Sequence, residues 1–233
     1  DTWRSSMSRV ILFGCGRGAD VAYRYLKCDS DHHICGFTVD ASYCKKKSHK
    51  GLPLVPFEEV ERYFPSDEYK MLILIGYQQM NHLRADKYFS AKNKGYSFIN
   101  YISSRAYSLE PINVGENCYI MEGQYINLDV SIGNNVVMWS CNHIGDNTII
   151  GDHVWFSSHI TIAGDVTIED YSFLGINASV SNHVNIASQT FIGAGAFIAH
   201  NTERGSVYIN PEAKYFGNDS MMFMKIMEAS KKL

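Results

Sequence analysis

The sequence lacks the features that mark several large classes of protein. Its formal net charge is only −3, so no basic surface for nucleic acid is predicted. No apolar stretch approaches the roughly 20 residues of a membrane-spanning helix, and segment 1–10 has no signal-peptide core. The six cysteines form no CxxC pair, which argues against a zinc site or a disulfide framework. This pattern favours a reducing compartment, and we expect a cytoplasmic protein with no membrane partner.

The chain contains two halves whose apolar residues recur with different periods. In the first half, continuous apolar runs alternate with segments of helical spacing. The pattern predicts strands over 9–16, 32–40, 70–77 and 96–103, and helices over 19–28, 56–64 and 82–95. Such alternation favours a parallel sheet with crossover helices, as in a Rossmann-like α/β domain.

The second half follows a repeat of six residues. Fifteen consecutive hexads run from Asn113 to Thr202, and the third residue of a hexad is often glycine, which we interpret as a corner that needs a permissive backbone. The second residue of every hexad is apolar: Val114, Ile120, Ile126, Ile132, Met138, Ile144, Ile150, Phe156, Ile162, Ile168, Leu174, Val180, Ile186, Ile192 and Ile198. We expect these side chains to point inward.

This repeat resembles the hexapeptide left-handed β-helix, in which three hexads form one triangular coil. The order of parts makes the resemblance more specific: a strand ending in GCGRG, a second strand ending in Asp40, a small α/β domain, and then the repeat. Over residues 7–217, and most clearly over 149–180, the chain resembles the bacterial nucleotide-sugar N-acetyltransferases of this superfamily. The bacillosamine acetyltransferase-like and sialic-acid O-acetyltransferase-like proteins belong to the same group.

The resemblance implies a division into three parts. They are an α/β nucleotide-sugar-binding domain over 7–103, a left-handed parallel β-helix of five coils over 104–204, and a tail over 205–233 that ends in a short helix. A homotrimer is implied as well. The helix, predicted over 221–232, is rich in methionine, and we expect it to cap the last coil or to pack on a neighbouring subunit.

The glycines that follow the first strand indicate a phosphate site. Gly14, Gly16 and Gly18 stand between a strand and a helix, where backbone N–H groups can approach a pyrophosphate. Their spacing is not the dinucleotide fingerprint, and a role in packing alone stays open. The resemblance implies that the nucleotide of a UDP-, dTDP- or GDP-sugar binds here. The implied binding residues are Gly14, Gly16, Arg17, Asp40, Gly76 and Tyr77.

Three histidines in segment 142–166 raise the question of a catalytic base. His143 and His159 are sixteen residues apart, close to one coil of eighteen, so we expect them near the same edge. His153 follows an aspartate at a corner and fits a structural role better. Zinc is not predicted, because the intervals differ from the three-histidine pattern of hexapeptide carbonic anhydrases.

Histidine suits the transfer of an acetyl group to an amine, because its pKa lies near neutrality and it can accept the proton of the amine. The chain departs from the family here. The usual base histidine falls on Asp146, and a second histidine, near the acetyl group, falls on Trp155. We rank His143 first as the base, His159 second and Asp146 third, and transfer without a protein base stays open.

The resemblance implies that acetyl-CoA lies in a groove between two prisms of the trimer. The positions that match its contacts are Trp155, Gly164, Ile176, Gly193 and Ala194, although small residues are also ordinary at corners. The predicted function is acetyl-CoA-dependent N-acetylation of a nucleotide-linked amino-deoxy sugar for a surface glycan such as O-antigen, lipopolysaccharide or capsule. The alternatives are a sugar O-acetyltransferase and a non-catalytic scaffold that binds sugar nucleotides.

Overall fold

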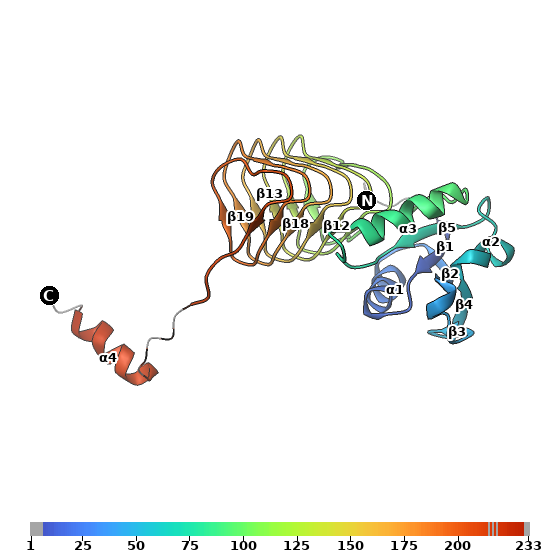
Figure 1. Cartoon of the computed structure of the whole chain (residues 1–233), viewed down its shortest axis with the longest axis horizontal. Coiled ribbons are helices and arrows are strands. Elements are labelled where there is room, and N and C mark those ends of the chain that lie inside the picture. Colours follow the sequence, from blue (N-terminus) through green and yellow to red (C-terminus); the bar gives the residue numbers. More distant parts are fainter. Residues whose placement is uncertain (1–6, 214, 216, 218, 231–233) are drawn as a thin grey trace.

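The computed structural model describes residues 7–213, 215, 217 and 219–230 of the chain. An α/β domain is followed by a three-sided prism of very short strands (Figure 1). In the same view, α4 (Ser220–Ser230) lies apart from the last coil and does not cap it, and its packing on a neighbouring subunit stays a prediction. None of the helices in the described residues is long and apolar enough to cross a membrane.

The α/β domain is built on a five-stranded sheet in the order β3-β4-β2-β1-β5. Its strands are β1 (Arg9–Phe13), β2 (His33–Val39), β3 (Ser48–His49), β4 (Leu52–Pro56) and β5 (Lys70–Ile73). The helices are α1 (Arg17–Asp29), α2 (Val60–Tyr63) and α3 (His82–Asn93), with the 3-10 turns η1 (Ala41–Tyr43) and η2 (Phe57–Glu59). The sheet is parallel except for the β3–β4 hairpin at its edge.

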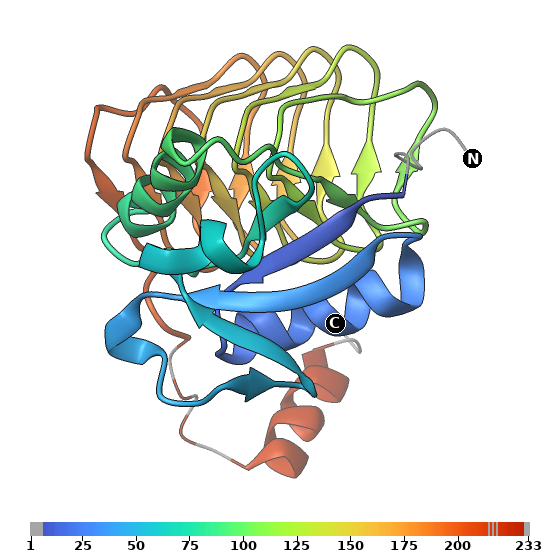
Figure 2. The same ribbon diagram turned by 90° about the vertical axis from the view of Figure 1, so that its right-hand side faces the viewer.

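Both faces of the sheet are covered, which explains why its strands are almost continuously apolar. Successive residues of β1 point to opposite faces. Val10 and Leu12 pack with α1 and with one side of the prism, whereas Ile11 and Phe13 pack with α2 and α3. Figure 2 shows α1 on one face of this sheet and α2 and α3 on the opposite face.

The predicted strand over 96–103 is wrong. Phe98 makes an isolated bridge with Met71, and β6 (Tyr101–Ile102) already belongs to the prism. Tyr96 and Phe98 are buried, and the Phe98 ring packs 4.8 Å from the Tyr88 ring of α3. The aromatic run therefore serves side-chain packing. The β3–β4 hairpin was missed, because its strands are short and β4 contains two prolines.

The prism consists of three parallel sheets whose strands are two residues long. Those after β6 are β7 Tyr107–Ser108, β8 Asn113–Val114, β9 Tyr119–Ile120, β10 Tyr125–Ile126, β11 Ser131–Ile132, β12 Val137–Met138, β13 His143–Ile144, β14 Ile149–Ile150, β15 Trp155–Phe156, β16 Thr161–Ile162, β17 Thr167–Ile168, β18 Phe173–Leu174, β19 Ser179–Val180, β20 Asn185–Ile186, β21 Phe191–Ile192, β22 Phe197–Ile198 and β23 Val207–Tyr208. Each strand of the repeat holds the first two residues of a hexad. The prism extends past the predicted repeat by β6, β7 and β23.

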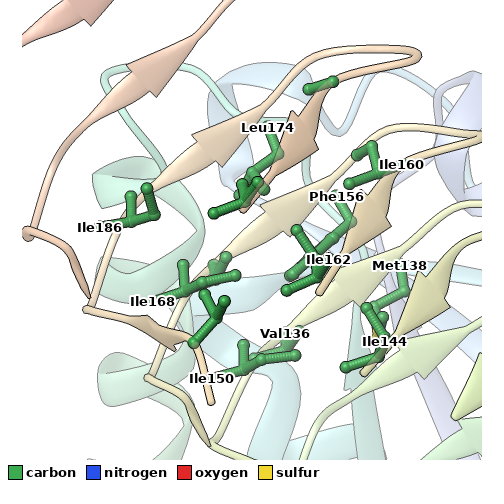
Figure 3. Close-up of a cluster of buried hydrophobic side chains, with 14 of the residues drawn as sticks. Val136, Met138, Ile144, Ile150, Phe156, Ile160, Ile162, Ile168, Leu174 and Ile186 are labelled. Carbon is green, nitrogen blue, oxygen red and sulfur yellow. The ribbon is translucent and has the colours of Figure 1, made fainter. Parts of the chain in front are cut away.

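The three sheets hold six, five and seven strands, in the orders β22-β19-β16-β13-β10-β7, β20-β17-β14-β11-β8 and β23-β21-β18-β15-β12-β9-β6. Strand residues of successive coils pair at a spacing of eighteen, as His143 does with Thr161, except in the last coil, where Phe191 pairs with Val207 sixteen positions later. The second residues of the hexads point inward and form one apolar core (Figure 3). All of them are buried except Val114, which is half-buried against the same core.

Three edges, called the first, second and third edge, join the three sheets of the prism. The first edge joins the seven- and six-stranded sheets and includes residues 139–142. The second edge joins the six- and five-stranded sheets and includes 145–148. The third edge joins the five- and seven-stranded sheets and includes 151–154.

The corners correct our interpretation of the glycines. The left-handed conformation falls on the fifth residue of the hexad, for example Asn135 (φ 57°) and His153 (φ 63°). The third-position glycines have ordinary φ angles, and they are small because neighbouring coils approach closely. A Cβ on Gly133 would lie 2.4 Å from Asp152 Oδ1 and 2.7 Å from the carbonyl carbon of Gly151.

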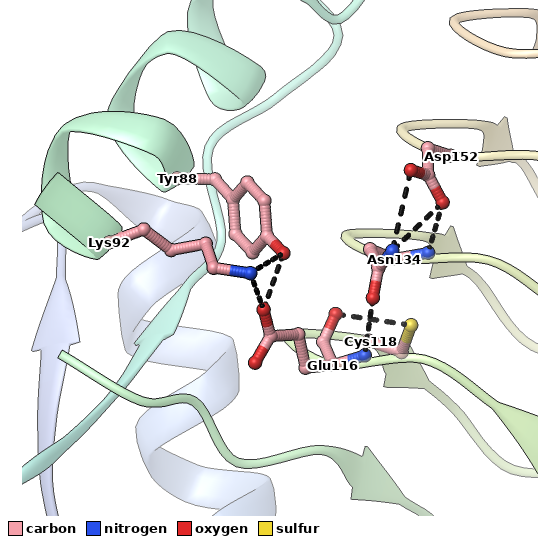
Figure 4. Close-up of polar contacts among 6 residues, drawn as sticks. All are labelled: Tyr88, Lys92, Glu116, Cys118, Asn134 and Asp152. Atoms are coloured by element: carbon pink, nitrogen blue, oxygen red, sulfur yellow. Dashed lines mark hydrogen bonds and ion pairs between the residues drawn. The ribbon is translucent and has the colours of Figure 1, made fainter.

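Helix α3 joins the α/β domain to the third edge through polar contacts. Arg84 is fully buried, and its guanidinium donates to the carbonyl oxygens of His153 (2.8 Å) and Asn135 (3.3 Å). Further along the same helix, Glu116 of the prism accepts hydrogen bonds from Tyr88 and Lys92 (Figure 4). These contacts place the α/β domain against the prism and so form the cleft between them.

Candidate active site

A cleft of about 400 Å³ opens where the α/β domain meets the prism. Its walls are the turn after β1, the first turn of α1, the segment that follows β5, and two indole rings of the prism. The lining residues are Gly14, Gly16, Arg17, Gly18, Ala19, Leu74, Ile75, Gly76, Gln78, Trp139 and Trp155. Of these, the sequence predicted Gly14, Gly16, Arg17, Gly18 and Gly76 for a nucleotide and Trp155 for acetyl-CoA.

The glycine turn brings the backbone of α1 to the cleft. Gly14 has φ +124°, which favours glycine, and its N–H donates to the carbonyl of Thr38 at 2.8 Å. Gly16 is the N-cap of α1 and makes no side-chain cap. A Cβ on Gly16 would meet no protein atom within 4 Å, so this residue faces open space. The N–H groups of the first helical turn are thus available to an anion.

Arg17 provides the positive charge of the cleft. Its side chain is exposed, and within the described part of the chain it forms no ion pair. No other lining residue is charged, and most of the remaining wall is apolar. A guanidinium beside a helix N-terminus suits a phosphate or diphosphate, because both attract negative charge and both donate hydrogen bonds.

Two indoles form the opposite wall. The rings of Trp139 and Trp155 lie 6.2 Å apart, and Tyr77 packs 5.4 Å from Trp155. The buried guanidinium of Arg84 lies 5.4 Å from the Trp155 ring, on the side of α3. Burial lowers the pKa of Arg84 to about 9, so Arg84 stays protonated at neutral pH. Burial also lowers the pKa of the neighbouring His153 to about 4 and keeps it neutral.

Two predicted nucleotide-binding residues do not line the cleft. Asp40 lies just after β2, as predicted, but its carboxylate pairs with Lys87 Nζ at 2.6 Å. Tyr77 is half exposed and packs on Trp155 and Phe173. Both residues lie in segments next to the cleft, and whether they bind a nucleotide remains a prediction.

None of the three candidate bases lines the cleft either. His143 begins β13, and its ring stacks on that of Tyr125 at 5.8 Å. His159 lies one coil further, exposed at the first edge with φ 59°, so the two histidines are near the same edge but are not register partners. Asp146 lies on the second edge, where its Oδ1 accepts a hydrogen bond from Leu128 N at 3.1 Å. Within the described residues, no hydrogen bond joins Asp146 to His143.

The positions expected to contact acetyl-CoA fall on two edges of one prism. Ile176, Gly193 and Ala194 follow each other along the first edge, and the N–H of Gly195 donates to the carbonyl of Ile176 at 2.8 Å. Gly164 lies on the second edge, directly beside Asp146 in the coil below. Trp155 lies instead in the cleft. No group of three or more histidine, cysteine, aspartate or glutamate residues that could hold a metal was found within the described part.

Sequence reasoning missed Ala19, Leu74 and Trp139, whereas the segment 75–81 was expected to form a wall of the nucleotide pocket. Trp139 stands at the third position of its hexad, where many other hexads have glycine. That departure from the repeat was a signal that this corner is exceptional. Ala19 and Leu74 carry no comparable signal, because both also belong to a buried apolar cluster.

No protein-family model matches the chain, and no curated protein matches its sequence. Several solved structures match most of it. PerB from Caulobacter crescentus, in complex with CoA and GDP-perosamine, is 22% identical with a TM-score of 0.73, over 87% of this chain and 94% of that chain. WeeI from Acinetobacter baumannii is 17% identical with a TM-score of 0.73, over 88% and 97% of the two chains.

The acetyltransferase domain of PglB from Neisseria gonorrhoeae, in complex with acetyl coenzyme A, is 15% identical with a TM-score of 0.72, over 87% and 96% of the two chains. At these identities the likeness establishes the fold. The predicted architecture, an α/β domain followed by a left-handed parallel β-helix and a short C-terminal helix, is confirmed.

Proposed function

We propose that this chain is an acetyl-CoA-dependent N-acetyltransferase that acts on the amino group of a nucleotide-linked amino-deoxy sugar in the cytoplasm. The observation that carries the proposal is the cleft, where a helix N-terminus and Arg17 face two indoles. This cleft occurs on a fold shared with PerB, which was solved with CoA and GDP-perosamine. A product of this kind would serve the synthesis of a surface glycan.

The parts of the cleft suit the parts of such a substrate. The diphosphate would lie against the N–H groups after Gly16 and beside Arg17, where negative charge is stabilised. The deoxy sugar would lie against Trp139 and Trp155, because the apolar face of a sugar ring packs well on indole. Asp40 and Tyr77 would contact the nucleoside, and for Asp40 this requires its carboxylate to be shared with Lys87.

The reaction needs two ligands that meet in line. The amine nitrogen attacks the thioester carbonyl, a C–N bond forms, and the C–S bond breaks to release the thiolate of CoA. The proton lost by the amine is accepted by a base or by water and ends on the thiol. His143 is our first candidate for the base, followed by His159 and Asp146.

A homotrimer would complete the site. Ile176 and Ala194 lie on the first edge of the prism, whereas Gly164 and Asp146 lie on the second. One groove can hold both sets only if the first edge of one subunit faces the second edge of another, and repetition of that contact around a threefold axis closes a ring. Acetyl-CoA would then lie between two prisms and reach the cleft.

The experiment is the release of CoA thiol from acetyl-CoA in the presence of GDP-, UDP- and dTDP-linked amino sugars. We expect release with at least one of them. A matched nucleotide sugar with hydroxyl in place of amine tests the O-acetyltransferase alternative. If no member of either set releases thiol, the protein is not this enzyme, and a scaffold function takes its place.

Gly16→Ala tests the cleft without disturbing the fold. Its φ of −98° suits alanine, and the added Cβ meets no protein atom within 4 Å. The methyl group would instead occupy the space proposed for the diphosphate, so we expect kcat/KM to fall at least tenfold with an unchanged melting temperature. Arg62→Gln, at an exposed arginine of α2, is the control and should keep full activity. Equal kcat/KM of Gly16→Ala and Arg62→Gln would show that the nucleotide does not bind in this cleft.

A further inference from the structure

The segment that follows β5 crosses the cleft between the α/β domain and the prism. The carbonyl oxygen of Leu74 lies 3.2 Å from the position of a Cβ on Gly18, in the first turn of α1. Further along the chain, the Tyr77 ring packs 5.4 Å from the Trp155 ring. The segment thus runs from the helix N-terminus, where we place the diphosphate, to the indole wall, where we place the sugar. Gln78 follows directly and lines the cleft.

The side-chain amide of Gln78 folds back over Gly76. A Cβ on Gly76 would lie 2.9 Å from Gln78 Oε1 and 3.2 Å from Gln78 Nε2, so the absence of a side chain there leaves room for the amide. The Gln78 side chain is exposed, and no other described residue forms a hydrogen bond with its amide. Apart from Arg17 and the two indole N–H groups, the other described lining residues have no polar side chain. The amide is therefore available to a ligand in the cleft.

The turn that follows Gln78 has an uncommon backbone conformation. Three consecutive residues, Gln79 (φ 54°), Met80 (φ 50°) and Asn81 (φ 67°), lie in the left-handed region. Residues other than glycine adopt this conformation at an energetic cost, and normally one at a time. A run of three persists only where the surrounding structure holds it, and strained segments of this kind concentrate at ligand sites.

Asn81 holds this turn in place. Its side chain is completely buried, and its Nδ2 donates to the carbonyl oxygens of Tyr171 (3.0 Å) and Ser172 (3.2 Å) in the prism. Its Oδ1 accepts a hydrogen bond from Arg84 Nη1 at 2.9 Å. The backbone N–H of Asn81 donates to the carbonyl of Tyr77 at 3.1 Å. The turn is thus tied both to the prism and to the segment in the cleft, which fixes the backbone between them.

We propose that Gln78 is a specificity-determining residue that binds two neighbouring hydroxyl groups of the sugar ring. Its amide lies in the cleft between the N-terminus of α1 and the indole wall, where the proposed function places the hexose. A primary amide offers an acceptor oxygen and two N–H donors, which matches a vicinal diol in which one hydroxyl donates and the other accepts. The substrate class is then a nucleotide-linked amino-deoxy hexose that keeps a vicinal diol. The inference rests on the proposed function for the kind of ligand.

Calorimetry with the full chain tests the proposal. The probes are GDP-4-amino-4,6-dideoxymannose and the UDP- and dTDP-linked forms of 4-amino-4,6-dideoxyglucose, each beside its own nucleoside diphosphate. Gln78→Met keeps the length of the side chain but removes its donors and acceptor, so it should weaken the tightest-binding nucleotide sugar at least fivefold and leave the nucleoside diphosphate unaffected. Gln79→Met is the matched control, because Gln79 is exposed, does not line the cleft and precedes a methionine of the same conformation. It should leave both affinities unchanged.

The 2-deoxy form of the same nucleotide sugar tests the contact itself, because these sugars carry their vicinal diol at C2 and C3. Loss of the C2 hydroxyl should weaken binding to the wild type at least threefold, and to Gln78→Met less than twofold, since its partner is already absent. Equal affinities of the wild type and Gln78→Met, an equal loss for the nucleoside diphosphate, the same deoxy effect in both proteins, or no binding of any probe would each overturn the proposal. These measurements need no acetyl-CoA. Thiol release without a Gln78 effect would therefore contradict this inference alone, and a Gln78 effect without thiol release would contradict the proposed function alone.

Discussion

At the scale of single residues, Arg84 connects the two parts of the molecule without a counter-charge. Its guanidinium donates to two carbonyl groups of the third edge and, at 2.9 Å, to Asn81 Oδ1. It also lies against Trp155, which forms a wall of the cleft. Neutral oxygen atoms thus replace the hydration that burial removes, and Arg84 is one of several side chains that hold α3 against the prism.

Arg84→Met should lower the free energy of unfolding by about 3 kcal/mol, because buried carbonyl groups lose their donors. Urea denaturation measures this loss. Arg62→Met, at an arginine whose side chain is 77% exposed, is the control and should change stability by less than about 0.5 kcal/mol. Equal stability of the two variants would contradict the role given to Arg84.

His143 is the residue on which the proposed chemistry depends most. His143→Ala should lower kcat at least tenfold while the melting temperature stays the same, because a general base contributes about 10²–10⁴-fold. His33→Ala is the control, since that side chain is exposed on β2, outside the cleft and away from the edges of the prism. Steady-state thiol release measures both variants. Unchanged turnover in His143→Ala would mean that His159, Asp146 or solvent accepts the proton of the amine.

At the scale of elements, the two isoleucines of β14 should contribute differently to the stability of the fold. Ile150 points into the core and is 2% exposed, whereas Ile149 points outward and is 52% exposed. Ile150→Ala should cost about 2–5 kcal/mol, because it removes buried apolar surface and leaves a cavity. Ile149→Ala should cost less than about 0.5 kcal/mol in the same denaturation experiment. Similar losses for both would contradict the assigned inward face.

The elements also show where a pattern predicts a structure and where it does not. The second residue of each hexad predicted the inward face correctly. Each side of the prism holds one hexad per coil, so the second position points into the core on all three sides. The glycines at the third position were recognised but explained wrongly. Gly133 serves a close approach between coils, and the left-handed corner falls on Asn135, because asparagine tolerates that conformation.

At the scale of the whole molecule, the proposed site extends beyond one chain. The cleft lies between the α/β domain and the prism, whereas His143, Asp146 and Gly164 face other directions. Sedimentation should therefore show a particle of about three times 26.3 kDa at micromolar concentration. A stable monomer that retains acetyl transfer would contradict the shared groove and would require a different position for acetyl-CoA.

The sequence by itself determined the prism and the outline of the α/β domain. The repeat of six, the continuous apolar runs and the helical spacing are local properties of the chain, and they indicate which residues of each element must be buried. The same local logic placed Gly14, Gly16 and Arg17 at a helix N-terminus, where the cleft is found.

Only the tertiary structure decided the rest of the cleft. Trp139 lines it because α3 docks on the third edge through Arg84, and Asp40 does not line it because its carboxylate is paired with Lys87. These relations join residues that are 40 to 100 positions apart. No repeat or local propensity specifies such distances, since they follow from the packing of one finished element on another.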